Sequence, residues 1–208
     1  MVEQSFKDIL FALNRFAVWP NTLVKRWHYA HPPQQGYLVN LGSGGHPVAG
    51  MINCDGNLFR RPDCWLDLRN RLPFPDGSCA LVTCSHTLEH LYPDECIEVL
   101  REIRRILRPG GLARIATPSM SHALEMAQGK AHLDWPRNFT DPVASSVNYL
   151  FCDGQHKYAY CFHIMDLFAR QAGFAGVADV SHANEACERV GVKLPQEPPG
   201  SLIVELTT

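Results

Sequence analysis

Three kinds of residue with chemical potential recur along this sequence: a glycine cluster, carboxylates that follow short apolar runs, and histidines. The glycine cluster, Gly42-Ser43-Gly44-Gly45, comes directly after the apolar run at 37–41. Glycine has no Cβ, so such a turn can adopt backbone angles forbidden to other residues and bring main-chain N–H groups close to a ligand. Asp55 follows, and one carboxylate can accept hydrogen bonds from two ribose hydroxyls. The pattern indicates a pocket for a nucleotide-like ligand.

Histidine is the side chain whose charge changes near neutral pH, so it is the natural candidate for moving a proton. His86 and His90 follow the apolar run at 79–84, and His156 lies beside Tyr158. We hypothesise that His156 or His90 is the base on the side of the site that holds the acceptor, the substrate that would lose a proton. The alternative for His90 is a helix-start residue next to Glu89.

The elements that must position these residues are strands at 37–41, 79–84 and 112–117, and strands ending at Asp55 and Asp67. In an open parallel sheet, ligands bind at the carboxyl ends of the strands. The segments between Gly42 and Asp55 and between Asp55 and Asp67 are too short for regular connecting helices. We therefore expect the first of these helices to be reduced to a loop or a single turn through His46-Pro47-Val48. Further strands are expected at 176–180 and 202–207.

Helical periodicity is clearest from Pro93 to the Pro109-Gly110-Gly111 stop. A second stripe covers 164–172, and a third runs from Phe6 to Ala17 and is expected to end at Pro20. Residues up to 35 would form an N-terminal helical cap, which either packs on the sheet or over the ligand, or docks a membrane face or a second subunit. Residues 121–160 lack strong periodicity, and a segment of this length is typical of a lid or acceptor-binding insertion.

The order of the motifs, more than any single one, carries a resemblance. The ordered set resembles the class I S-adenosylmethionine (SAM) dependent methyltransferases, especially the small-molecule, methyltransferase type 11-like group. The motifs are Asn53-Cys54-Asp55, Trp65-Leu66-Asp67-Leu68, Leu72-Pro73-Phe74-Pro75-Asp76-Gly77, Ser85-His86-Thr87-Leu88-Glu89-His90 and Leu107-Arg108-Pro109-Gly110-Gly111.

This resemblance implies an α/β, Rossmann-like fold with a seven-stranded, mainly parallel sheet and helices on both faces. It also implies SAM as cofactor and methyl transfer to an O, N or C atom of a small-molecule metabolite. One domain over 1–208 is expected, with the cap at 1–35, a SAM-binding core at 36–120, the lid at 121–160 and a C-terminal helix and strands at 161–208.

The resemblance also assigns cofactor-binding residues. Asp67, or the backbone of Leu68, would receive the adenine amine, although each aspartate could instead be a turn carboxylate. Asn40 stands where many relatives carry an acidic residue, so a charge contact with the cofactor's ammonium is missing there. The residues expected to bind the cofactor are Asn40, Gly42, Ser43, Gly44, Asp55, Asp67, Leu68, Ser85 and His86.

The amino-acid composition limits the kinds of partner that this chain is expected to bind. The formal net charge of -2 gives no field that would hold nucleic acid, and no apolar run is long enough to cross a membrane. The eight cysteines contain no CxxC pair, so reduced thiols and a cytoplasmic location are expected. No metal site is expected, because the spacing of Cys152, His156, Cys161 and His163 matches no familiar pattern. A homodimer through the N-terminal helix or the lid is an open possibility.

Three rival functions can be compared with the motifs of the sequence. A nicotinamide dehydrogenase would need glycine at position 47, where this chain has Pro47. A serine hydrolase would need a GxSxG elbow, which this sequence lacks. Cys84-Ser85-His86 looks like a nucleophile with its base, but adjacent residues on a strand point to opposite faces, so a buried cysteine is the better explanation. The remaining alternative is a non-catalytic SAM-binding module that senses the cofactor or supports a partner enzyme.

Overall fold

A computed structural model of the chain describes residues 13, 15–131, 139–183 and 187–208. Its helices are α2 (Trp19–His28), α3 (Pro93–Ile106), α4 (Met120–Ala127), α5 (Pro142–Phe151) and α6 (Phe162–Gln171), with single turns η1 (Leu58–Arg60), η2 (Leu88–His90), η3 (Cys152–Gly154) and η4 (Ser181–Ala183). Its strands are β1 (Tyr37–Leu41), β2 (Ile52–Asp55), β3 (Cys64–Trp65), β4 (Cys79–Ser85), β5 (Leu107–Pro118), β6 (Gly176–Asp179), β7 (Cys187–Arg189), β8 (Val192–Leu194) and β9 (Ser201–Thr207).

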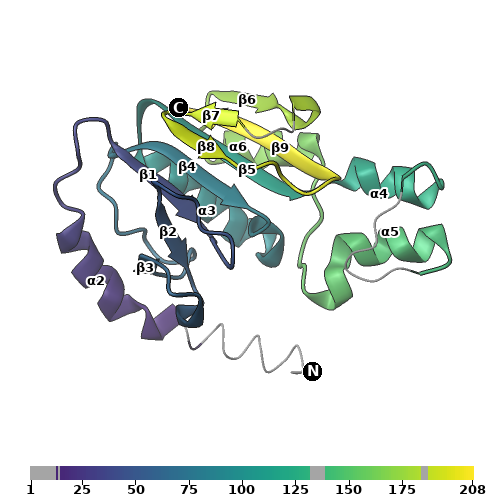
Figure 1. Cartoon of the computed structure of the whole chain (residues 1–208), viewed down its shortest axis with the longest axis horizontal. Helices are drawn as coiled ribbons and strands as arrows, with labels where there is room; N and C mark the ends of the chain where they lie inside the picture. The colour runs from purple at the N-terminus through teal and green to yellow at the C-terminus, as the bar shows by residue number, and fades with distance from the viewer. Residues whose placement is uncertain (1–12, 14, 132–138, 184–186) are drawn as a thin grey trace.

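Seven strands form one twisted sheet in the order β3-β2-β1-β4-β5-β9-β6 (Figure 1). The first five are parallel, and Asn40 is paired with Asn53 on one side and Thr83 on the other. β9 runs antiparallel to both β5 and β6. The predicted seven-stranded, mainly parallel sheet is therefore confirmed. Among the described strands, β7 and β8 pair only with each other. They form a small hairpin that lies between β6 and β9 in the sequence.

One face of the sheet carries most of the core. Side chains alternate between faces along a strand, so Val82 and Cys84 of β4 point to the same side. They pack there with α3 and α6, which contribute Leu100 and Met165 to the same cluster. α3 begins as expected, with Pro93 in its first turn, and it ends at Ile106, just before the predicted Pro-Gly-Gly stop. This face is the thick side of the molecule.

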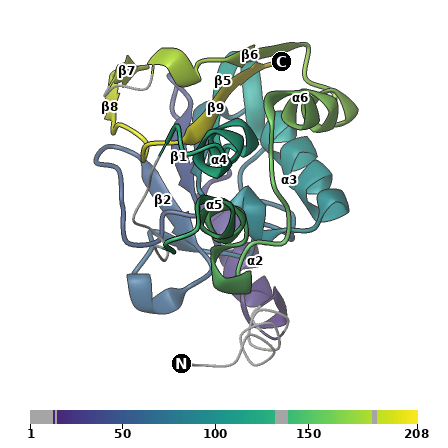
Figure 2. The ribbon, with the colours of Figure 1, turned by 90° about the vertical axis from the view of Figure 1, so that its right-hand side faces the viewer.

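The opposite face is covered by the β7–β8 hairpin and a loop. Its cluster consists of Met51, Leu81, Val192 and Leu194. Residues 42–51, all of them described, form turns in place of a helix, and only the single turn η1 separates β2 from β3. The predicted shortening of the early helices is thus confirmed. Figure 2 shows α3 and α6 on one side of the sheet and the hairpin on the other.

The N-terminal cap differs from the prediction in one respect. Pro20 was expected to end a helix, yet it lies in the first turn of α2, where its missing N–H would have no partner in any case. Most of the predicted helix from Phe6 to Ala17 lies outside the described residues. α2 packs beside β3, with the Asn21 amide donating to the Trp65 carbonyl and the Lys25 ammonium to the Asp63 carbonyl.

The expected lid contains two helices that sequence periodicity did not reveal. α4 and α5 pack on each other beyond the carboxyl end of the sheet (Figure 1), with a small core of Ala123, Met126, Tyr149 and Leu150. Tyr149 ties the pair to the sheet, because its hydroxyl donates to the Gly200 carbonyl at 2.7 Å. Among the helices that the structure describes, none is long and apolar enough to cross a membrane.

Candidate active site

A cavity of about 520 Å³ opens at the carboxyl ends of the parallel strands. This volume falls in the range of small-molecule and cofactor sites. Residues from the turns after β1, β2, β3 and β4 line it, together with the start of α3 and the segment after α5. The lining residues are Gly42, Gly44, Asp55, Gly56, Asn57, Leu66, Asp67, Leu68, Arg69, His86, Thr87, His90, Leu91, Tyr92, Glu95, Gln155 and Lys157.

The glycine turn needs its glycines. Gly42 and Gly44 have φ angles of 68° and 50°, in the left-handed region that side chains disfavour. Gly42 also lies directly against Thr87, since a Cβ at position 42 would be 2.1 Å from the threonine Oγ1. Ser43 does not line the cavity, and its N–H donates to the Cys54 carbonyl at 3.0 Å, which fixes the turn to β2.

Asp55 ends β2 and presents its carboxylate to the cavity. The Gly44 N–H donates to Oδ2 at 2.7 Å, and the Asn57 N–H donates to Oδ1 at 2.7 Å. Both oxygens are thereby held in place, and each carboxylate oxygen keeps a second lone pair for a ligand hydroxyl. The Trp65 indole N–H donates to the Gly56 carbonyl at 2.9 Å and closes the loop behind this carboxylate.

Asp67 lies two residues beyond β3, which ends at Trp65 and not at Asp67 as predicted. β3 is short because only two residues pair with β2 before the chain turns away. Asp67 is 7% exposed and forms a two-pronged ion pair with Arg69, with Nε 2.9 Å from Oδ1 and Nη2 2.7 Å from Oδ2. The hydrogen bonds that the Arg69 guanidinium donates to Asp67 are the main reason that the Arg69 pKa is raised. Arg69 and Leu68 both line the cavity.

This ion pair gives a stability prediction. Arg69→Met should lower the free energy of unfolding by about 2 kcal/mol, because it leaves a mostly buried carboxylate without its two-pronged partner. The matched control is Arg71→Met, whose Asp76 partner is 3.6 Å away and whose side chain is 59% exposed. Urea unfolding should show less than about 0.5 kcal/mol for the control. Equal losses in the two variants would contradict a special role for Arg69.

Asn40 is placed away from the cavity. Its Nδ2 donates to Asn53 Oδ1 at 3.0 Å, and its Oδ1 accepts from the Thr83 hydroxyl at 3.0 Å. Asn53 in turn holds the loop before β2, accepting from the Val48 N–H at 2.8 Å. The side chain of Asn40 thus joins three neighbouring segments on the hairpin side of the sheet.

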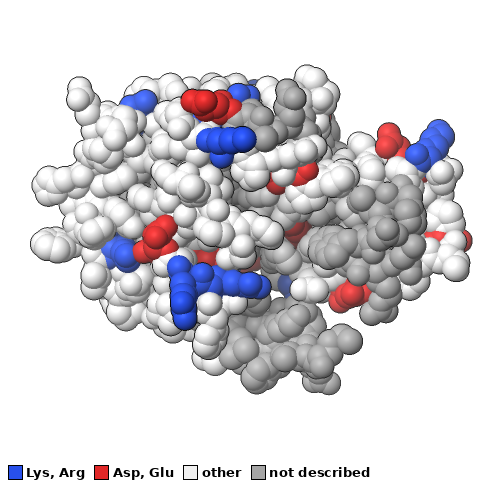
Figure 3. All heavy atoms as spheres, viewed as in Figure 1, with Lys and Arg blue, Asp and Glu red and all other residues white. Residues whose placement is uncertain are grey.

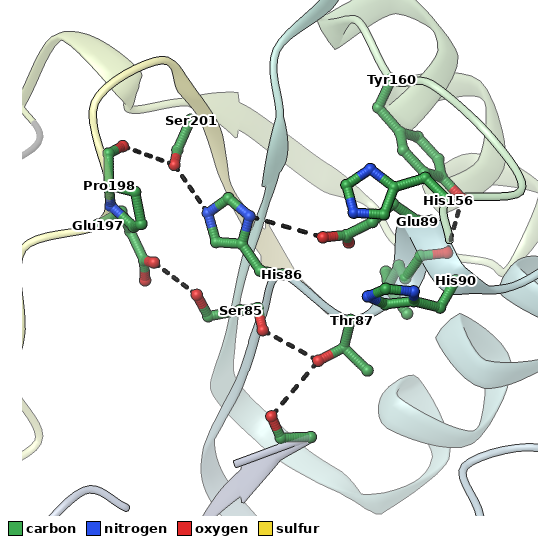
Figure 4. Close-up of polar contacts among 12 residues, drawn as sticks. Ser85, His86, Thr87, Glu89, His90, His156, Tyr160, Glu197, Pro198 and Ser201 are labelled. Carbon is green, nitrogen blue, oxygen red and sulfur yellow. Dashed lines mark hydrogen bonds and ion pairs between the residues drawn. The ribbon is translucent and has the colours of Figure 1, made fainter. Parts of the chain in front are cut away.

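Ser85 and His86 connect the end of β4 to the segment before β9 (Figure 4). The Ser85 hydroxyl donates to Glu197 Oε2 and does not line the cavity. The His86 Nε2 is 2.9 Å from the Ser201 hydroxyl oxygen, which itself donates to the Pro198 carbonyl at 2.7 Å. Since that hydroxyl proton is committed, His86 Nε2 must be the donor. His86 lines the cavity and has a φ of 46°.

The other ring nitrogen of His86 faces Glu89. Nδ1 is 3.5 Å from Glu89 Oε1 (Figure 4). Burial favours the neutral imidazole, but the Glu89 carboxylate outweighs burial and, with a smaller contribution from Glu197, raises the His86 pKa above its ordinary value. Cys84, just before this pair, is fully buried, and burial raises its thiol pKa, which favours the inert cysteine that the sequence predicted.

His90 and His156 are brought together, with ring centroids 4.9 Å apart. His90 lines the cavity, whereas His156 is 6% exposed and lies behind it. Burial lowers the His156 pKa. The four residues Cys152, His156, Cys161 and His163 do not meet as a ligand group in the described part of the chain.

Sequence reasoning missed several cavity residues. Arg69 had a usable signal, because an Asp-x-Arg turn after a strand lets both side chains point to one side. Gln155 and Lys157 had none, since they come to the cavity through the fold of the α4–α5 segment. The Lys157 N–H donates to the Glu89 carbonyl at 2.7 Å, and this backbone contact brings the segment alongside η2.

Solved structures show the same architecture. A SAM-dependent methyltransferase from Archaeoglobus fulgidus has a TM-score of 0.57 at 16% identity, covering 90% of this chain and 94% of that one. The SAM-dependent methyltransferase SibL has a TM-score of 0.50 at 13% identity, and this chain spans 50% of its length while 83% of this chain is covered. Such distant likeness concerns the fold alone. No curated protein sequence matches.

A family model matches part of the sequence. Residues 49–115 match the family model of the methyltransferase domain. This part of the chain is therefore similar to methyltransferase domains, in agreement with the resemblance noted from the motif order. The matched segment runs from the loop before β2 through β5, so it contains Asp55, Asp67 and His90 of the cavity.

Proposed function

We propose that this protein transfers the methyl group of SAM to an O, N or C atom of a small-molecule acceptor bound in the same cavity. The observation that carries the proposal is the division of the cavity wall. At one end, the Asp55 carboxylate is fixed by two main-chain N–H groups. At another, His86 and His90 line the wall. One region suits a ribose and the other suits a reacting polar group.

In the proposed arrangement, Asp55 accepts the two ribose hydroxyls of the cofactor. Leu68 packs against the adenine, whose amine is received by Asp67 or by the Leu68 backbone. Gly42 and Gly44 border the methionine part, where their N–H groups and lack of side chains allow close approach. Asn40, Ser43 and Ser85 act one step away, by holding the strand ends and loops in place.

The chemistry demands little beyond alignment. A lone pair of the acceptor atom attacks the methyl carbon, the methyl–sulfur bond breaks, and its electron pair stays on sulfur to give neutral S-adenosylhomocysteine. The acceptor's proton, where it has one, leaves to a neighbouring group or to water. Holding the two reactants in line supplies most of the rate enhancement. The hypothesis that His156 or His90 is the base stays a prediction, and of the two only His90 reaches the cavity wall.

The surroundings favour a small acceptor over nucleic acid. Acidic and basic side chains are interspersed on the face drawn in Figure 3, and most of that face is uncharged. The formal net charge is -2. A homodimer through the N-terminal helix or the α4–α5 pair remains part of the proposal, supported by the exposed Trp27 and Val143. A cytoplasmic location is likewise proposed from the buried thiols of residues such as Cys79.

Ligand-dependent stability tests this function first. S-adenosylhomocysteine at about 100 times its Kd should raise the Tm by roughly 5–10 °C for a chain of this size. NAD at the same concentration should leave the Tm unchanged. Incubation with SAM and a panel of small hydroxylated and amino compounds, read by mass spectrometry for a gain of one methyl group, then tests transfer. Cofactor binding without any methylated product would favour the non-catalytic SAM-binding module, and stabilisation by NAD alone would overturn the assignment.

A further inference from the structure

Three side chains meet at the edge of the cavity: Glu89, His90 and His156, here called the Glu-His-His cluster. A ligating atom of each lies within 4.8 Å of those of the other two. Figure 4 shows the Glu89 carboxylate joined to the His86 ring by a dashed line, with the His156 ring beside it. Two members come from η2, and the third comes from the segment after α5.

Glu89 lacks the partners that a buried carboxylate needs. Its exposure is 1%, and neither carboxylate oxygen has a hydrogen-bond donor among the described residues. The nearest cationic group is His86, whose Nδ1 is 3.5 Å from Oε1, beyond ordinary hydrogen-bond length. A buried charge without partners is costly, so its retention calls for a ligand. A carboxylate oxygen of Glu89 also lies within 4.8 Å of a ring nitrogen of each of the other two cluster members.

Both histidines are oriented to offer a lone pair. The Nδ1 of His156 is 2.8 Å from the Leu150 carbonyl oxygen, and the Nδ1 of His90 is 3.2 Å from the Gln155 carbonyl oxygen. A carbonyl oxygen can only accept, so each Nδ1 carries the proton and each Nε2 is left with a lone pair. Metal-bound histidines are commonly fixed in this way, by donating their other N–H to a backbone carbonyl.

We propose that the Glu-His-His cluster binds a divalent transition-metal cation, with an open coordination position that faces the cofactor cavity and accepts an oxygen of the methyl acceptor. Two imidazoles and one carboxylate form a donor set for such cations, and three protein ligands with one open position are typical of catalytic sites. Ligand atoms around a tetrahedral cation with bonds of 2.0–2.1 Å are about 3.3 Å apart. The three ligating atoms, now within 4.8 Å of one another, would have to draw together by a small adjustment of the side chains when the cation binds.

This site deepens the proposed function and rests on it. A hydroxyl bound to such a cation loses its proton more readily, as metal-bound water does. The proton leaves to water, and the resulting oxygen lone pair attacks the methyl group. His90 and His156 then act as metal ligands and not as free bases. The acceptor class narrows to compounds with an oxygen able to ligate the cation, such as a phenol or another hydroxyl group.

Cobalt binding tests the site without reference to activity. The full chain, freed of metal with EDTA and dialysed, is titrated with Co²⁺ alone by calorimetry and visible absorption. We expect one equivalent to bind, with the Kd raised at least tenfold in Glu89→Gln and in His90→Ala. Circular dichroism and thermal unfolding of both variants report whether they are folded. His90 is exposed, so its variant tests the site even if Glu89→Gln unfolds.

The matched control is His163→Ala, an exposed histidine on α6 that belongs to the Cys and His group considered from the sequence. It should bind Co²⁺ as the unaltered chain does. The proposal is overturned if the unaltered chain binds no Co²⁺, or if Glu89→Gln and His90→Ala bind it with unchanged Kd. If the unaltered chain does not bind S-adenosylhomocysteine, the proposed function is overturned. The Co²⁺ titration is a separate measurement and decides the cation site by itself.

Discussion

Gly42→Ala should lower the free energy of unfolding by about 2–4 kcal/mol. Two effects add. The φ of 68° is unfavourable for alanine, and the new Cβ would lie 2.1 Å from Oγ1 and 2.7 Å from Cγ2 of Thr87. Either the glycine turn or the start of η2 has to move. Urea unfolding measures the loss, and titration with S-adenosylhomocysteine should show weaker binding as the turn is displaced.

Gly129→Ala separates these two effects. Gly129 has nearly the same φ, 69°, but a Cβ there would meet nothing within 4 Å. The control should therefore lose only about 1 kcal/mol, the cost of the backbone conformation. Combining Gly42→Ala with Thr87→Gly removes the atoms that clash and should recover part of the difference. If Gly42→Ala and Gly129→Ala are equally destabilised, the contact with Thr87 has no energetic importance.

Asp55→Ala should weaken the binding of S-adenosylhomocysteine by about 100-fold or more. A hydrogen bond to a charged group contributes about 1.5–3 kcal/mol, and the variant would remove two such bonds to the ribose. The Gly44 and Asn57 N–H groups would also lose their acceptor, so the wall of the cavity would be less well ordered. Isothermal titration calorimetry with S-adenosylhomocysteine gives the Kd directly.

The control for charge is Asp94→Ala, an exposed aspartate in the first turn of α3 that does not line the cavity. Its Kd should stay within about twofold of the unaltered chain, since an exposed helix-dipole contact is worth less than about 1 kcal/mol to the fold and touches no ligand. Thermal unfolding of both variants shows whether they are folded. A folded Asp55→Ala protein with unchanged Kd would remove this residue from the cofactor site.

The parts of the fold that sequence could predict are those where local pattern and tertiary burial agree. β4 is buried on both faces and reads as a continuous apolar run. α3 has an apolar stripe and a proline in its first turn, and Pro109 follows shortly after its last residue. The glycine turn and Asp55 could be found together because residues just beyond parallel strands share one edge of the sheet. The short connections from β1 to β2 and from β2 to β3 could be predicted because too few residues separate these strands for a regular helix.

α5 shows why the lid helices escaped prediction. Its buried face includes Ser145 and Ser146, whereas Val143 and Val147 are about half exposed, at 54% and 50%. The serines are satisfied locally: each hydroxyl donates to a backbone carbonyl, at 2.9 Å for Ser145 and 2.8 Å for Ser146. Polar residues inside and apolar ones outside reverse the pattern on which helix prediction depends.

The candidate site divides along the same line. Asp55, Asp67 and His86 lie in motifs that follow strands, so their approach to one cavity follows from topology. The approach of His156 to Glu89 depends on the path of the whole α4–α5 segment, which no spacing in the sequence encodes. Likewise, the bonds that engage the Asn40 amide come from the register of three adjacent strands. Resemblance located the residue but not its surroundings.

The uneven covering of the sheet has a dynamic consequence. On the hairpin side, four buried apolar side chains shield the centre of β4, whereas two full helices shield the other side. Within the described residues, the hairpin pairs with no other strand, so it can detach without breaking the ladder of the main sheet. Transient solvent entry into this protein should begin there. The backbone amide protons near Leu81 and Leu194 would then exchange through a local opening that costs much less free energy than global unfolding.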